Sequence, residues 1–95
     1  MTNYEVMFII DPTLEEEARD AVIETVKGII DADGQAGETD IWGMRKLAYP
    51  INKKSEGFYV VMQFEGNTTL PKELDRRLKI SDNVMRHIII NKDEK

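Results

Sequence analysis

The stretch FYVVMQF, residues 58–64, has the alternating pattern of a β-strand. From Phe58 to Phe64 every second side chain is apolar, and these side chains would share one face of the strand. The intervening positions would point to the opposite face, where Tyr59 and Val61 add further apolar surface. A strand of this kind must be covered on both faces, or leave one face for another molecule.

Three further segments have extended patterns. They are YEVMFII at residues 4–10, a longer stretch over about residues 37–51, and VMRHIII at residues 84–90. In the longer stretch Gly43 predicts a bulge or bend, and Pro50 suits a strand at the edge of a sheet. By simple alternation, one face of that stretch would carry Thr39, Ile41, Leu47, Tyr49 and Ile51.

The first amphipathic helix is predicted between the first two strands. Apolar residues recur near the helical period from Leu14 to Ile29, with mostly charged residues around the rest of the helix. Thr13 and Glu16 have the spacing of a capping box, and Gly34 would end the helix.

A second helix is predicted by three leucines at four-residue spacing, from Leu70 to Leu78. Thr69 is its expected cap, and Pro71 suits its first turn. The order is therefore strand, helix, strand, strand, helix, strand, which packs most economically as a four-stranded antiparallel sheet with both helices on one face. The face without helices would carry Met7, Ile9, Tyr59, Val61, Arg86, Ile88 and Ile90.

Length and composition limit the class of protein. Ninety-five residues, 41% of them hydrophobic, are enough for one small core, so we expect a single domain over residues 1–95. The absence of cysteine excludes disulfides, thiol nucleophiles and cysteine-based metal sites. The start of the chain lacks a signal-peptide pattern, and no apolar run approaches the roughly 18 residues of a membrane span. We therefore expect a cytoplasmic protein without a membrane partner.

Charge is distributed unevenly along the chain. The formal net charge is −5, but residues 1–40 hold eleven acids and two bases, whereas residues 41–95 hold eleven bases and seven acids. Because the Debye length is about 8 Å at physiological salt, a cationic surface can act locally if folding places the acidic helix elsewhere. This asymmetry indicates contact with nucleic acid.

No constellation of residues predicts an enzyme. The loop at residues 11–13 has neither an arginine nor a glycine-rich anion nest. The acids at residues 15–17 and Asp20 match no calcium-loop spacing and fit the solvated face of a helix. His87 is the single histidine and is expected to be structural. We therefore expect no catalytic residue, metal, cofactor or small-molecule substrate.

Cations and aromatic residues gather in MRKLAYPINKKSEGFYV, residues 44–60. This stretch contains two basic pairs, at 45–46 and 53–54, and Arg86 and Lys92 follow on the last strand and its exit. Together these cations predict a surface that contacts phosphates.

Two functions remain open at this point. Tyr49 and Tyr59 could stack on unpaired bases, but residues 58–64 lack the signature of the common RNA-recognition motif, so backbone and shape recognition is expected. The alternative is a homodimeric regulatory domain of the same architecture that binds a small ligand. It would explain an apolar sheet face, but it leaves the basic pairs unexplained.

Two segments resemble the signature of the bacterial small-subunit ribosomal protein S6 family. The first is MRKLAYPI at residues 44–51 with EGFY at 56–59, and the second is RLKISDNVMR at 77–86. YEVM at residues 4–7 and the Asp-Pro pair at 11–12 fit as well, so the resemblance covers essentially the whole chain. It implies an α+β, ferredoxin-like β-α-β-β-α-β fold with a four-stranded antiparallel sheet and two helices on one face.

The resemblance also implies a function. It is that of a structural component of the small ribosomal subunit, which binds 16S ribosomal RNA together with ribosomal protein S18 in the central domain, or platform. The implied location is the cytoplasm, in the small subunit. The expected RNA-binding residues are Arg45, Lys46, Lys53, Lys54 and Arg86. The expected partner interface consists of Tyr49, Tyr59, Val61 and Ile88.

Overall fold

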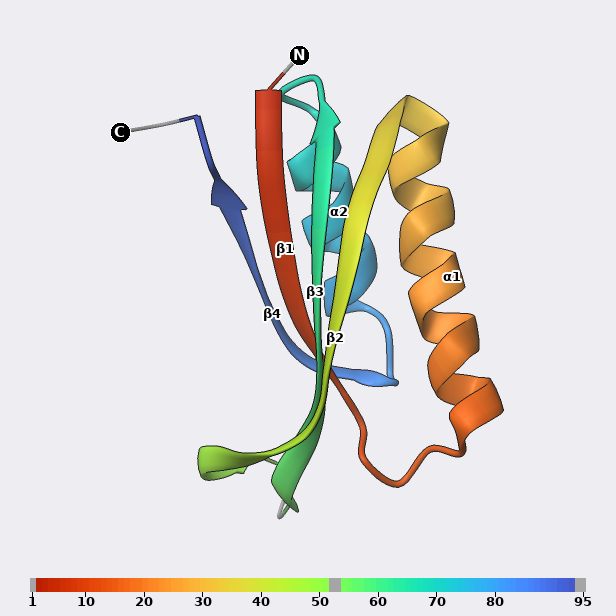
Figure 1. Cartoon of the computed structure of the whole chain (residues 1–95), viewed down its shortest axis with the longest axis vertical. Helices are drawn as coiled ribbons and strands as arrows, with labels where there is room; N and C mark the ends of the chain where they lie inside the picture. The colour runs from red at the N-terminus through yellow and green to blue at the C-terminus, as the bar shows by residue number, and fades with distance from the viewer. Residues whose placement is uncertain (1, 52–53, 94–95) are drawn as a thin grey trace.

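The computed structural model describes residues 2–51 and 54–93 and has the predicted order of elements (Figure 1). These elements are β1 (Thr2–Ile10), α1 (Glu16–Asp33), β2 (Gly34–Ile51), β3 (Lys54–Gly66), α2 (Leu70–Lys79) and β4 (Val84–Asn91). The strands form one antiparallel sheet in the order β2-β3-β1-β4. The predicted fold class is confirmed, and Pro50 lies on an edge strand as expected.

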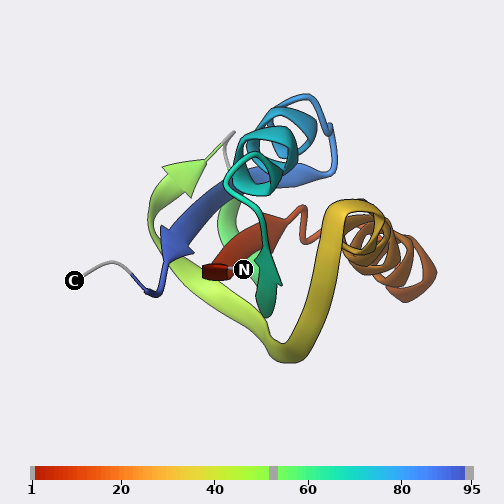
Figure 2. The same ribbon diagram turned by 90° about the horizontal axis from the view of Figure 1, so that it is seen from above.

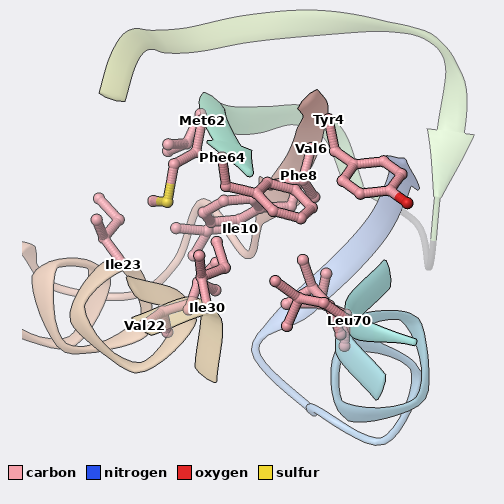
Figure 3. Packing of buried hydrophobic residues seen from close by; sticks show 14 residues of the cluster. Tyr4, Val6, Phe8, Ile10, Val22, Ile23, Ile30, Met62, Phe64 and Leu70 are labelled. Atoms are coloured by element: carbon pink, nitrogen blue, oxygen red, sulfur yellow. The ribbon is translucent and has the colours of Figure 1, made fainter. Parts of the chain in front are cut away.

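The core lies between the sheet and the two helices, which cover the same face (Figures 1 and 2). On β1 the alternate side chains Val6, Phe8 and Ile10 are fully buried. Figure 3 shows them facing residues of α1, such as Ile30, and Leu70 of α2. Burying apolar surface stabilises a fold by about 25 cal/mol per Å², so this layer is the main favourable contribution to folding.

The predicted cap Thr13 is wrong, because Glu15 is the N-cap of α1, whereas Thr69 is the N-cap of α2 as predicted but makes no cap hydrogen bond with its side chain. The hydroxyl and the N–H of Thr13 donate to Asp11 Oδ1 at 2.7 and 2.9 Å, so Thr13 closes a turn before α1. Before α2, Asn67 Oδ1 accepts from the N–H groups of Thr69 and Leu70, both at 3.1 Å. Short polar side chains therefore bind the nearby amides, but Thr13 and Thr69 make no side-chain cap.

The predicted bulge in β2 lies at Gly43. The register moves from Ile41 opposite Val60 to Gly43 opposite Tyr59, so Trp42 is one extra residue on β2. Gly43 has φ +81°, a backbone conformation that glycine adopts without a steric penalty.

The bulge reverses the alternation of β2. Before it, Asp40 lies opposite Val61 and points away from the helices; after it, the odd-numbered Arg45, opposite Gly57, does so. The expectation that one face of β2 holds every odd-numbered residue from Thr39 onward is therefore wrong.

The sheet face without helices is called the open face below. Its centre is set by the pairing of Met7 with both Val61 and Ile88, and by the pairing of Ile9 with both Tyr59 and Arg86. This register confirms the face predicted for β1, β3 and β4. The residues that β1, β3 and β4 place on it are Glu5, Met7, Ile9, Tyr59, Val61, Gln63, Arg86, Ile88 and Ile90.

Candidate nucleic-acid interface

The end of β2, residues 44–51 and here called the β2 arm, reaches across the open face. Arg86 of β4 donates a hydrogen bond to the hydroxyl of Tyr49, and its guanidinium carbon lies 5.9 Å from the centre of that ring. Because β2 and β4 are opposite edges of the sheet, this contact requires the arm to curl past β3 and β1 (Figure 2). This contact therefore joins Tyr49 on the arm to Arg86 on β4, which are 37 positions apart in the sequence.

Gly57 leaves room for this crossing. A Cβ atom at Gly57 would collide with Ile9 Cγ2 and would lie 3.6 Å from Leu47 Cδ2. Ile9 is consequently only 6% exposed and Val61 only 7%. The open face is thus partly covered by the chain itself, and Val61, a predicted partner contact, offers little surface.

An aromatic and cationic cluster lies where β2 bulges. The rings of Trp42 and Tyr59 are nearly parallel, with an interplanar angle of 8° and centres 6.4 Å apart. Arg45 lies over the Trp42 ring at 5.6 Å, and Trp42 Nε1–H donates to Asp40 Oδ2 at 3.0 Å. The sequence analysis missed Trp42, although the single tryptophan next to a bulge glycine was an available signal.

The predicted RNA-binding cations have different positions. Arg45 and Arg86 lie on the open face, and neither forms an ion pair with another described residue. Lys46 pairs across the strands with Glu56 and points to the other face of β2. Lys53 lies outside the described residues.

Lys54 has an acidic partner in the fold. Its Nζ donates to Asp11 Oδ2 at 2.5 Å, and both side chains are partly buried. This hydrogen bond from Lys54, together with the N–H of Thr13, lowers the pKa of Asp11 from 3.8 to about 2. Lys54 therefore ties the start of β3 to the end of β1.

Charges on α2 are mostly paired within the helix. Glu73 accepts from Arg76 at 2.6 Å, which lowers the pKa of the Glu73 carboxyl. Asp75 contacts His87 Nε2 at 2.6 Å and Lys79 at 3.1 Å, and these contacts lower the pKa of Asp75, His87 contributing most. The contact with Asp75 fits the structural role expected for His87.

Within residues 2–51 and 54–93, no group of three or more His, Asp or Glu side chains could hold a metal ion. None of the helices described there is long and apolar enough to cross a membrane.

A family model described as Ribosomal protein S6 matches residues 3–91 of the chain. The chain belongs to the ribosomal protein S6 family. Small ribosomal subunit protein bS6 of Clostridium novyi (strain NT) is 50% identical over 95 residues, which cover 99% of this chain and 100% of the relative. The protein of the same name from Clostridioides difficile (strain 630) is 47% identical over 90 residues, which cover 95% and 98%.

The fold agrees with the family. The crystal structure of 30S ribosomal protein S6 from Thermotoga maritima superposes with a TM-score of 0.91 at 34% identity, covering 96% of this chain and 87% of the other. Members of the family are structural, cytoplasmic proteins of the small ribosomal subunit and not enzymes, so the predictions of family, non-enzymatic class and location are confirmed.

The Lys54–Asp11 pair gives a pH-dependent prediction. A carboxyl whose pKa is lowered on folding adds stability that is complete above its unfolded pKa of 3.8 and is lost as the pH falls through about 2. Lys54→Met should therefore lower the free energy of unfolding by about 1 to 2 kcal/mol at neutral pH. The difference from the unsubstituted chain should vanish near pH 2, as measured by urea unfolding across pH.

Lys27→Met is the matched control, because Lys27 forms only a long 3.8 Å pair with exposed Glu24. It should change stability by less than about 0.5 kcal/mol at every pH. An equal loss for Lys54→Met at pH 2 and pH 7 would show that the effect is packing and not the ion pair.

Proposed function

We propose that this chain, as a single domain, binds 16S ribosomal RNA together with ribosomal protein S18 in the central domain of the small ribosomal subunit. One observation carries the proposal: Arg45 and Arg86, two guanidinium groups without a carboxylate partner among the described residues, share the open face with exposed apolar side chains. Such a face fits an anionic polymer and a protein partner at the same time.

The RNA contact depends most on Arg45 and Arg86. Guanidinium groups bind phosphate with two parallel hydrogen bonds, and each of these two is already held over an aromatic ring. Lys46 and Lys53 remain proposed phosphate contacts. Lys54 can contribute only alongside Asp11, which already neutralises it.

The acidic residues explain why a second protein is needed. α1 lies on the helix-covered side of the sheet, away from the open face, and carries most of the acids of the N-terminal half (Figure 2). Even so, a net charge of −5 repels the RNA backbone and weakens the overall attraction. We therefore expect weak RNA binding by the chain alone, and tighter binding once a basic partner such as S18 is present.

The partner contact uses the apolar surface that the β2 arm leaves uncovered. Ile88 and Ile90 of β4 are 42% and 48% exposed, and Tyr49 on the arm is 56% exposed. Isolated surface isoleucines are common, but two neighbours on one edge strand beside an exposed tyrosine form a continuous patch. Tyr59 and Val61 of β3 lie on the same face, separated from β4 by Ile9 and Met7 of β1, and remain proposed partner contacts. The alternative of a ligand-binding regulatory dimer finds no support in the family to which the chain belongs.

The phosphate contacts predict a change in salt dependence. Each phosphate contact contributes about 0.7 to 0.9 to the slope of log affinity against log salt concentration. Replacing both Arg45 and Arg86 by glutamine should therefore lower the magnitude of that slope by about 1.4 to 1.8. Filter binding of a central-domain RNA fragment, with S18 present, measures the slope over a salt series.

Lys27→Gln on α1 is the control and should leave the slope unchanged. An unaltered slope for the double variant would remove Arg45 and Arg86 from the RNA contact. Titration of the RNA with each protein separately and with both completes the test. Equally tight binding by this chain alone would contradict the need for a partner.

The partner contact predicts a separate effect. Ile88→Asp places a charge in the apolar patch and should weaken binding of S18 by about 2 kcal/mol or more, roughly 30-fold. Its fold should survive, because Ile88 is already 42% exposed. Isothermal titration with S18 gives the affinity.

Ile80→Asp provides the matched comparison. Ile80 is 69% exposed at the end of α2, on the helix side of the molecule, so its substitution should leave S18 binding unchanged. Equal weakening by both variants would mean that general charge and not the patch controls association.

A further inference from the structure

Trp42 is held in a defined orientation although its side chain is partly exposed. Its indole N–H donates to Asp40, one ring contact is made with Tyr59, and Arg45 lies over the ring. The residue as a whole nevertheless remains 45% exposed. Three contacts from three residues thus fix an aromatic ring at the surface without burying it.

The exposed part of the Trp42 side chain offers apolar area to a ligand. Covering the exposed part of an indole would gain about 25 cal/mol for each Å² of apolar area. Trp42 lies on the open face by alternation, two residues after Asp40, and there it stacks on Tyr59. The ring is therefore an ordered aromatic surface that has lost its rotational freedom before any ligand arrives.

We propose that Trp42 and Arg45 form a stacking subsite for one unpaired nucleobase of RNA. The proposal deepens the proposed function and rests on it, since it concerns how RNA is held on the same face. It assigns to Trp42 a contact with the base and to Arg45 a contact with the phosphate of the same nucleotide or its neighbour.

The polar groups around the ring favour a base over a protein side chain. Asp40 accepts the indole N–H, so the polar edge of Trp42 is satisfied, and the part of the side chain that stays exposed beside Tyr59 and Arg45 is aromatic. Arg45 has no acidic partner among the described residues, which leaves its charge for an anion beside the ring. A flat π surface next to an unpaired cation is complementary to a nucleotide, which has a flat base and a phosphate.

The carboxylate of Asp40 gives the subsite a direction. It repels phosphate at the N–H edge of the ring, while Arg45, which lies over the ring, attracts it. A bound nucleotide is therefore expected to point its phosphate toward Arg45. Stacking of this kind tolerates any base, because every base has a π face.

The single tryptophan makes the subsite directly observable by fluorescence. The probes are an eight-nucleotide single-stranded adenylate RNA and a blunt RNA duplex of the same length, added to the chain with S18 already bound. Trp42 emission should be quenched by the single strand and not by the duplex, whose bases are already stacked. Because intrinsic emission of a tryptophan in S18 would interfere, any such residue is first replaced by phenylalanine.

Substitution separates stacking from charge. Trp42→Leu should lower affinity for the single strand by about 5-fold to 150-fold, the equivalent of one lost base stack, and leave duplex affinity unchanged. Arg45→Gln should weaken both. Trp42→Phe keeps an aromatic ring and should restore part of the single-strand affinity. Should Trp42→Leu fail to fold, quenching of the unsubstituted chain still decides the question.

The outcomes distinguish this inference from the proposed function. Tight binding of central-domain RNA without quenching of Trp42 by the single strand would overturn the stacking subsite and leave the function standing. Quenching caused by S18 alone, with no further change on adding RNA, would place Trp42 in the protein interface and also overturn it. Failure of every RNA to bind, with S18 present, would reject the proposed function itself.

Discussion

One extra residue in β2 controls what the open face displays. A strand alternates its side chains strictly, so an insertion at Trp42 and Gly43 moves the paired residues that follow it, Met44 to Lys46, to the opposite face. The positive φ of Gly43 is the local condition for this insertion, because residues with a Cβ atom rarely adopt that conformation. Without the bulge, Lys46 would lie on the open face, and Arg45 would point toward the helix side.

This reversal links the fold to its surface chemistry. Leu47 covers Ile9 and so protects part of an apolar face from solvent, while Tyr49 reaches Arg86 on the far edge of the sheet. The same turn of the strand brings Arg45 next to Trp42. Two arginines are thereby held on aromatic rings on one face, and the acidic helix α1 lies on the other side of the sheet. A chain with a negative net charge can in this way keep a local cationic and apolar surface.

Sequence patterns were sufficient for the elements and insufficient for details that depend on long-range contacts. Alternation and helical periodicity located four strands and two helices. Each element buries one face, and this sets the spacing of its apolar residues: two positions in a strand and three to four in a helix. Gly43 signals the bulge, but simple alternation along β2 gives the wrong face for the residues that follow it, because the register shifts there. Neither threonine makes a side-chain cap, because the hydroxyls of Thr13 and Thr69 donate instead to Asp11 and Asn67.

The candidate site shows the same limit. Arg45 and Arg86 were identified from their charge, and the structure brings them to one face. Lys54 was grouped with them because its partner Asp11 lies 43 residues away and no local pattern announces that ion pair. Trp42 was overlooked because its contacts with Tyr59 of β3 and with Arg45 form only in the folded sheet.

Proton contacts across the β2 arm, measured by nuclear Overhauser spectroscopy on the unsubstituted chain, test the central claim most directly. The bulge predicts contacts from the Leu47 methyl groups to Ile9 and from the Tyr49 ring to the Arg86 side chain. Contacts to Ile9 and Arg86 from Lys46 and Ala48 instead would show that the alternation of β2 is not reversed, and would contradict the account.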